Sequence, residues 1–116
     1  MHPWSDSAPI YRQLADRLAA QLLDGEPPEG QAMPSVRALA SRYLINPLTV
    51  SRALQSLVDD GLVESRRGVG MYVQAGARRR LLQTERERFL QHEWPALRER
   101  LKRLGLTPSD LDWEAN

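Results

Sequence analysis

The sequence lacks several features that would place the chain in common functional classes. None of its 116 residues is cysteine, which excludes disulfides and thiolate metal ligands and fits a cytoplasmic protein. The two histidines, His2 and His92, lie far apart, which argues against a metal site. No run of about 18 apolar residues indicates a membrane span, and no basic-then-apolar N-terminus indicates a secretory signal. We therefore expect a cytoplasmic protein without metal, cofactor or membrane contact.

Catalytic constellations are also absent from the sequence. No nucleophile–base pair or metal-ligand cluster is recognisable, and Gly68 and Gly70 lack the strand-to-helix setting that a nucleotide-binding loop requires. His92, Glu93 and Glu99 lie in a charged helical pattern, where such residues usually form a solvated face. We therefore predict that the chain is not an enzyme.

The charge of the chain is nearly balanced but unevenly distributed. The net charge is +1, yet residues 30–58 contain Arg37, Arg42 and Arg52 and no acidic residue. A locally positive stretch in a near-neutral protein is what a phosphate-facing surface requires. Three arginines are also ordinary on a solvated surface, so charge alone does not decide between the two interpretations.

The spacing of apolar residues predicts three helices and a hairpin. Leucines recurring every four residues indicate the first helix, and Ser35 and Asn46 are suitable N-caps for two more, with Pro47 in the first turn of the last. Two short apolar runs around a glycine-containing turn predict paired strands. The predicted helices cover 9–24, 35–43 and 47–60, and the predicted strands cover 62–66 and 71–74. This order is that of a winged helix-turn-helix, a mainly α (α+β) fold with a two-stranded wing.

After residue 76 the sequence becomes a charged helical tail. Its apolar residues step by four, three, four and three residues, which is a coiled-coil-like seam. Pro95 is expected to kink or break the helix near Trp94. Because the tail is too short to enclose a sizeable ligand pocket, its seam should be covered by the winged domain or by a second copy. The seam comprises Leu90, Trp94, Leu97, Leu101 and Leu104.

Three segments carry a family resemblance: residues 33–40 (MPSVRALA), residues 46–54 (NPLTVSRAL), and residues 61–73, which contain GLV and GVGMYV. In this order and spacing they resemble the DNA-binding domain of the GntR family of bacterial regulators. The Asn-Pro-x-Thr-Val-x-Arg-Ala form, followed by a short tail, is similar to the YtrA subfamily. The resemblance covers residues 8–75 strongly and the tail weakly.

The resemblance implies a winged helix-turn-helix DNA-binding domain over residues 8–75 and a helical dimerisation tail over 77–113. It implies a transcriptional regulator that binds a pseudo-palindromic operator as a homodimer, and in this subfamily often a repressor of a transporter operon. The sequence identifies no small-molecule effector and leaves its existence open. The expected dimer contacts are Leu82, Phe89, Leu90, Trp94, Leu97, Leu101 and Leu104.

Residues expected to contact DNA lie on the second helix, the third helix and the wing. A recognition helix presents its N-terminal residues to base edges in the major groove, and amides at a helix N-terminus favour phosphate. Arginines beside a wing-tip glycine can enter a minor groove. The contact by Arg37 is implied by the resemblance. The predicted set is Ser35, Arg37, Asn46, Pro47, Leu48, Thr49, Ser51, Arg52, Gln55, Arg66, Arg67 and Gly68.

Several positions allow two interpretations. Leu48 stands where many relatives of the family carry a polar residue, and it could contact a thymine methyl group or pack against its own helix turn. Arg78, Arg79 and Arg80 suit either DNA flanks or a solvated linker. The main alternative to the whole assignment is a winged helix that binds another protein and not DNA.

Overall fold

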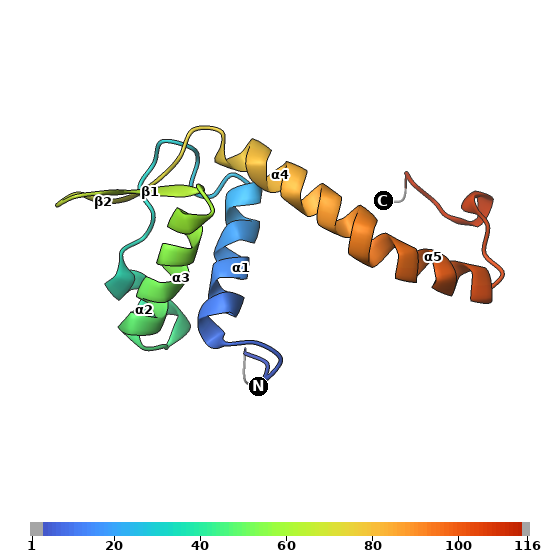
Figure 1. Cartoon of the computed structure of the whole chain (residues 1–116), viewed down its shortest axis with the longest axis horizontal. Helices are drawn as coiled ribbons and strands as arrows, with labels where there is room; N and C mark the ends of the chain where they lie inside the picture. Colours follow the sequence, from blue (N-terminus) through green and yellow to red (C-terminus); the bar gives the residue numbers. More distant parts are fainter. Residues whose placement is uncertain (1–3, 115–116) are drawn as a thin grey trace. The chain divides into compact units, whose positions relative to one another are not determined.

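The structure is a computed structural model that describes residues 4–114. It confirms the predicted fold class, because three helices precede a two-stranded antiparallel sheet and further helices follow it (Figure 1). Contacts divide the chain into two compact units, one up to Leu82 and one from Gln83 onward. The elements are α1 (Ile10–Leu23), α2 (Val36–Tyr43), α3 (Pro47–Asp59), β1 (Val63–Arg66), β2 (Gly70–Val73), α4 (Ala77–Arg88), a π-helical turn (Phe89–Glu93), α5 (Trp94–Arg103) and a 3-10 turn (Pro108–Asp110).

The core of the first unit is built on the leucine stripe of α1. Leu14, Leu18 and Leu22 are buried, as predicted from their spacing of four residues. They belong to one apolar cluster with the inward face of α3, which packs alongside α1 (Figure 1). Burying one such side chain stabilises a fold by about 1.5–3 kcal/mol. The buried residues of α3 are Val50, Ala53, Leu54 and Leu57.

Local hydrogen bonds begin both helices of the helix-turn-helix. The Ser35 hydroxyl accepts a hydrogen bond from the Ala38 amide at 3.0 Å, and the Asn46 side-chain oxygen accepts one from the Leu48 amide at 2.8 Å. Both predicted caps are therefore confirmed. Between them, Leu44 ends α2 with φ of 55° while its side chain is 88% exposed. This left-handed conformation is unfavourable for a leucine, and the Ile45 amide closes the helix end by donating to the Ala40 carbonyl at 3.1 Å.

The wing is a two-stranded hairpin whose register pairs Val63 with Val73 and Arg66 with Gly70. A short segment that the sequence did not suggest lies along the other edge of β2, where Ala32 forms an isolated bridge with Tyr72. The Met33 amide donates to the Met71 carbonyl at 2.7 Å, which supports the same pairing. The segment is too short for its side-chain pattern to indicate a strand.

Side-chain hydrogen bonds connect the start of α4 to the rest of the first unit, called here the winged unit, which extends to Leu82 and contains the hairpin. The Glu29 carboxylate accepts hydrogen bonds from the amides of Gly76, at 2.8 Å, and Arg78, at 3.3 Å. The Arg78 guanidinium donates to the Leu23 carbonyl at 2.7 Å, and that of Arg80 donates to the Gly61 carbonyl at 2.6 Å. Neither sequence interpretation of these two arginines anticipated this role, which is to bind main-chain carbonyls.

Pro95 was expected to kink or break the tail helix near Trp94, and the structure shows an irregular turn there without a break. The backbone forms a π-helical turn over Phe89–Glu93 and then continues as α5 through Pro95. Proline lacks an amide donor and crowds the carbonyl four residues earlier, and a single π turn is one way in which helices accommodate such a defect. The division between compact units lies within α4. The functional domains assigned to residues 8–75 and 77–113 remain a prediction.

The described residues contain no helix that is both long and apolar enough to span a bilayer. They also contain no group of three or more His, Asp or Glu side chains arranged to hold a metal. His2 lies outside the described residues.

The hydrogen bonds to Glu29 predict a pH-dependent stability. Donation from the Gly76 amide, and then from the Arg78 amide, lowers the pKa of the Glu29 carboxyl. A carboxyl with a lowered folded-state pKa stabilises the fold above its ordinary pKa of about 4.3, and loses that contribution as the pH falls through the lowered value. Glu29→Gln should therefore have a lower Tm than the wild type at pH 7, and the difference should narrow as the pH falls below the ordinary carboxyl pKa of about 4.3.

Glu26→Gln is the matched control, because the exposed carboxylate of Glu26 has no hydrogen bond or ion pair within residues 4–114. Thermal denaturation followed by circular dichroism measures all three proteins. A Glu29→Gln deficit that is equal at pH 3 and pH 7 contradicts the assigned role of the carboxylate.

Candidate nucleic-acid interface

The outward face of α3 carries most of the predicted contact residues. Because the opposite stripe is buried in the core, Leu48, Ser51, Arg52 and Gln55 are all exposed, Leu48 to 75%. Asn46 and Pro47 precede this face and are exposed, whereas Thr49 is partly buried. The structure therefore brings these seven residues onto or beside one accessible helix surface.

The electrostatic setting of α2 and α3 favours an anion. Neither helix has an acidic residue in its first turn, where free amides and the helix dipole concentrate positive potential. Ser35 and Arg37 are exposed at the start of α2. Within the described part of the chain, the Arg37 guanidinium has no hydrogen bond or ion pair, so its donors are available to an external acceptor.

Arg52 rests on an aromatic ring that sequence reasoning did not assign to the site. Its guanidinium carbon lies 4.1 Å from the centre of the Tyr11 ring, which α1 supplies. The neighbouring Arg12 also faces this ring, at 5.4 Å, and donates to the Ser56 hydroxyl of α3 at 3.3 Å. Tyr11 and Arg52 are far apart in the sequence, and no spacing pattern links them.

The Gln55 side chain forms a hydrogen bond within its own helix. Its amide nitrogen donates to the Asp59 carboxylate at 3.0 Å, one turn toward the C-terminus. A contact from Gln55 to adenine would require this hydrogen bond to break. Asp59 thus draws the Gln55 side chain toward the acidic end of α3 and away from its N-terminus.

The wing presents Arg66, Arg67 and Gly68 to solvent. The Arg66 guanidinium carbon lies 4.1 Å from the centre of the Tyr72 ring, which β2 supplies. Gly68 has φ of +74°, and a side chain there would meet no atom within 4 Å. Glycine is needed for the turn itself, and the open space beside it allows another molecule to approach the backbone.

The tail leaves its apolar residues uncovered. Trp94 and Leu101 are partly buried, and the other five predicted dimer contacts are at least 40% exposed. Beyond the predicted set, Leu111 is 48% and Trp113 is 96% exposed. The exposed members of the predicted set are Leu82, Phe89, Leu90, Leu97 and Leu104.

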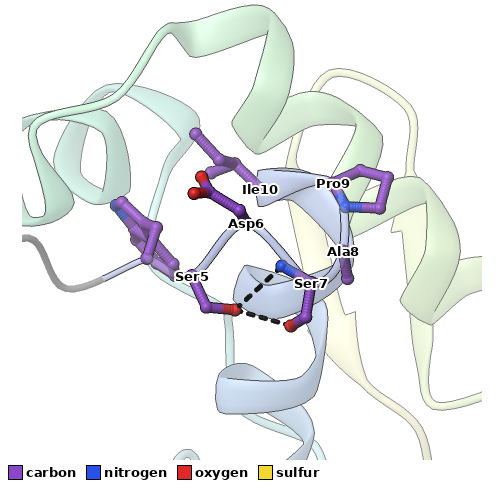
Figure 2. Close-up of a pocket in the computed structure, with 7 residues that line it drawn as sticks. Ser5, Asp6, Ser7, Ala8, Pro9 and Ile10 are labelled. Atoms are coloured by element: carbon purple, nitrogen blue, oxygen red, sulfur yellow. Dashed lines mark hydrogen bonds between the residues drawn. The ribbon is translucent and has the colours of Figure 1, made fainter.

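A separate hollow lies beside the segment that leads into α1, and none of the predicted site residues lines it (Figure 2). Ser5 and Ser7 hydroxyls lie 2.6 Å apart and share a hydrogen bond there. The Gln13 side chain binds the Ser5 backbone through both of its polar atoms, at 2.9 and 2.8 Å. These polar groups are therefore used to hold the segment in place.

Comparison with known families matches the winged unit. The family described as "Bacterial regulatory proteins, gntR family" matches residues 10–73. The HTH-type transcriptional repressor YtrA of Bacillus subtilis is 38% identical over 77 residues, which are 66% of this chain and 59% of YtrA. The mannosyl-D-glycerate transport/metabolism system repressor MngR of Escherichia coli is 42% identical over 65 residues, 56% of this chain and 27% of MngR. The chain thus spans less than two thirds of the length of either relative.

Solved structures extend the likeness to the tail. A GntR family transcriptional regulator from Listeria monocytogenes superposes with a TM-score of 0.72 at 27% identity, covering 92% of each chain. The DNA-binding domain of AraR, solved in complex with operator ORR3, gives a TM-score of 0.55 at 24% identity and covers 63% of this chain and 90% of that one. The second likeness concerns the fold alone.

Proposed function

The chain belongs to the GntR family of bacterial regulatory proteins, and on this premise we propose that it regulates transcription by binding double-stranded operator DNA. The observation that carries the proposal is the exposed outward face of α3. It lies within the acid-free stretch of residues 30–58 and is fixed by the buried stripe on the opposite side. A helix with this distribution of charge and burial suits the major groove.

In this proposal each element has a distinct role. The N-terminus of α3 enters the major groove, where Ser51 and Arg52 face base edges or phosphates, and Asn46 and Thr49 lie near a phosphate. Arg37 at the start of α2 contacts the DNA backbone. Arg66 and Arg67 approach the minor groove, whose negative potential attracts guanidinium groups. At Ser35, Pro47 and Gly68 the protein backbone lies close to the DNA.

The exposed apolar seam of the tail supports a homodimer. A second copy would cover the side chains that a single chain leaves exposed, and two-fold symmetry would present two recognition helices to two half-sites. We propose a pseudo-palindromic operator for this reason. The names of YtrA and MngR, both repressors, support repression, and that of MngR supports a transport-linked operon. An effector, if one acts, is unidentified.

Salt dependence tests the DNA-binding proposal directly. On a DNA fragment selected by the purified protein, Arg37→Ala and Arg52→Ala should each weaken binding. Arg37→Ala should also lower the slope of log affinity against log salt by about 1, because it removes a phosphate contact. Fluorescence anisotropy over a series of salt concentrations gives both quantities.

Arg98→Ala, which removes an exposed arginine from α5, is the control and should leave the slope unchanged. Wild-type protein that selects no DNA, or binds it with no salt dependence, would support the alternative of a protein-binding module.

We expect the Leu48 side chain to contact the methyl group of a thymine in the operator. Its 75% exposure leaves it poorly packed against its own helix, which favours the thymine contact over the packing alternative. Replacing the relevant thymine of the selected operator by deoxyuridine removes one methyl group and should weaken wild-type binding about fourfold. Leu48→Ser should bind both operators equally. If deoxyuridine weakens binding equally in the wild type and in Leu48→Ser, Leu48 does not contact the thymine methyl group.

The apolar seam of the tail predicts that the protein is a dimer. Leu97→Glu places a charge within the seam and should shift the protein from dimer to monomer in sedimentation velocity, because the buried carboxylate would lack a partner. Arg98→Glu, one position away, introduces the same side chain outside the predicted contacts and should remain dimeric. A dimer that survives Leu97→Glu unchanged contradicts the assignment of the seam.

A further inference from the structure

Two of the arginines assigned to DNA share the same arrangement. The guanidinium carbons of Arg52 and Arg66 each lie 4.1 Å from the centre of a tyrosine ring, Tyr11 and Tyr72 respectively. Within residues 4–114, neither guanidinium group forms a hydrogen bond or an ion pair. The two pairs lie on different elements, one joining α3 to α1 and the other within the wing, so the arrangement occurs twice independently.

Ring contact alone does not set these two arginines apart, because Arg12 also faces Tyr11 at 5.4 Å and Arg17 faces Trp4 at 4.5 Å. The difference lies in the use of the N–H donors by three other arginines. Arg78 and Arg80 use their N–H donors on the carbonyls of Leu23 and Gly61. Arg12 donates to the Ser56 hydroxyl. These three arginines therefore use N–H donors on the protein, whether or not they also face a ring. Arg52 and Arg66 are held only through contact with a ring.

The chemistry of the guanidinium explains why this difference matters. The group is planar, its five N–H donors lie in that plane, and it stacks on aromatic faces. Contact through the face therefore leaves the donors available for a bidentate acceptor such as phosphate or the edge of guanine. Because Arg52 and Arg66 are exposed, an external anion can reach them.

The rings themselves are well fixed. Tyr11 is partly buried and packs against the apolar core, and Tyr72 is partly buried in β2, opposite Glu64 and bridged to Ala32. A tyrosine has only two side-chain torsions, whereas a free arginine loses considerable rotamer entropy when it is immobilised. A fixed ring that restrains the arginine beforehand reduces this loss on binding.

We propose that Tyr11 and Tyr72 are positioning residues, which hold Arg52 and Arg66 over their rings so that the guanidinium donors are presented to DNA. The proposal rests on the proposed function of the winged unit. Neither tyrosine needs to touch the DNA. Tyr72 acts through Arg66 and Tyr11 through Arg52, whereas Arg12 lies farther from the Tyr11 ring, at 5.4 Å, and donates to Ser56.

The test is a double-mutant cycle on the selected operator, with affinity measured by fluorescence anisotropy. Tyr11→Leu should weaken binding about two- to fivefold when Arg52 is present, which is the size of an exposed cation–π contact. It should cause no further loss in the Arg52→Ala background. Tyr11→Phe keeps the ring and should retain wild-type affinity. Tyr72 with Arg66 should give the same pattern.

Equal losses from Tyr→Leu in both arginine backgrounds would overturn the proposal, because the tyrosine would then act through the fold or on the DNA directly. No loss in either background would also overturn it. If the wild-type protein selects no DNA at all, that result would instead contradict the proposed function. This inference, which rests on that function, would then be wrong as well.

A measurement on the protein without DNA distinguishes loss of arginine positioning from unfolding of the leucine variants. Ring currents should move the side-chain proton resonances of Arg52 and Arg66 upfield in NMR spectra of the wild type. The shift should persist in Tyr11→Phe and Tyr72→Phe and vanish in the leucine variants, while the core methyl resonances remain in place. Ordinary arginine resonances in the wild type would contradict the stacking on which the proposal depends.

Discussion

The interface depends on one packing contact, the burial of the apolar stripe of α3 against α1. Val50, Ala53, Leu54 and Leu57 are buried in the same cluster as the leucines of α1. Since successive helical residues are rotated by about 100°, burying this stripe fixes which side chains of α3 face outward. The accessibility of Leu48, Ser51 and Arg52, and therefore the whole proposed mode of DNA binding, follows from that rotation.

Helix α1 has a second role beyond supporting the core. Its leucine face packs against α3, while Tyr11, on the edge of that face, lies beneath the Arg52 guanidinium. The wing repeats the pairing with Tyr72 and Arg66 on its own strands. The same elements that form the core thus also contact the cationic groups. Under the proposed mode of binding, changes in the supporting helix should alter DNA affinity without touching the DNA.

The sequence predicted those features that local chemistry determines. The bounds and caps of α2 and α3 depend on Ser35, Asn46 and Pro47, which act within one helical turn, and the residues that carried the GntR resemblance lie in the same segments. The Tyr11–Arg52 stack, the bridge at Ala32 and the anchoring of Arg78 and Arg80 were missed because each joins residues that are distant in sequence. The π-helical turn before Pro95 was missed because proline indicates a defect without specifying how the helix absorbs it.

The most direct measurement of the central claim is a map of backbone amide resonances in NMR spectra of the protein as selected operator DNA is added. The account predicts the largest changes at residues 35–37, at the N-terminal half of α3 over residues 46–52, and at the wing tip over residues 66–68. Changes confined to the hollow before α1 or to the residues from Gln83 onward, with these three segments unaffected, would contradict it.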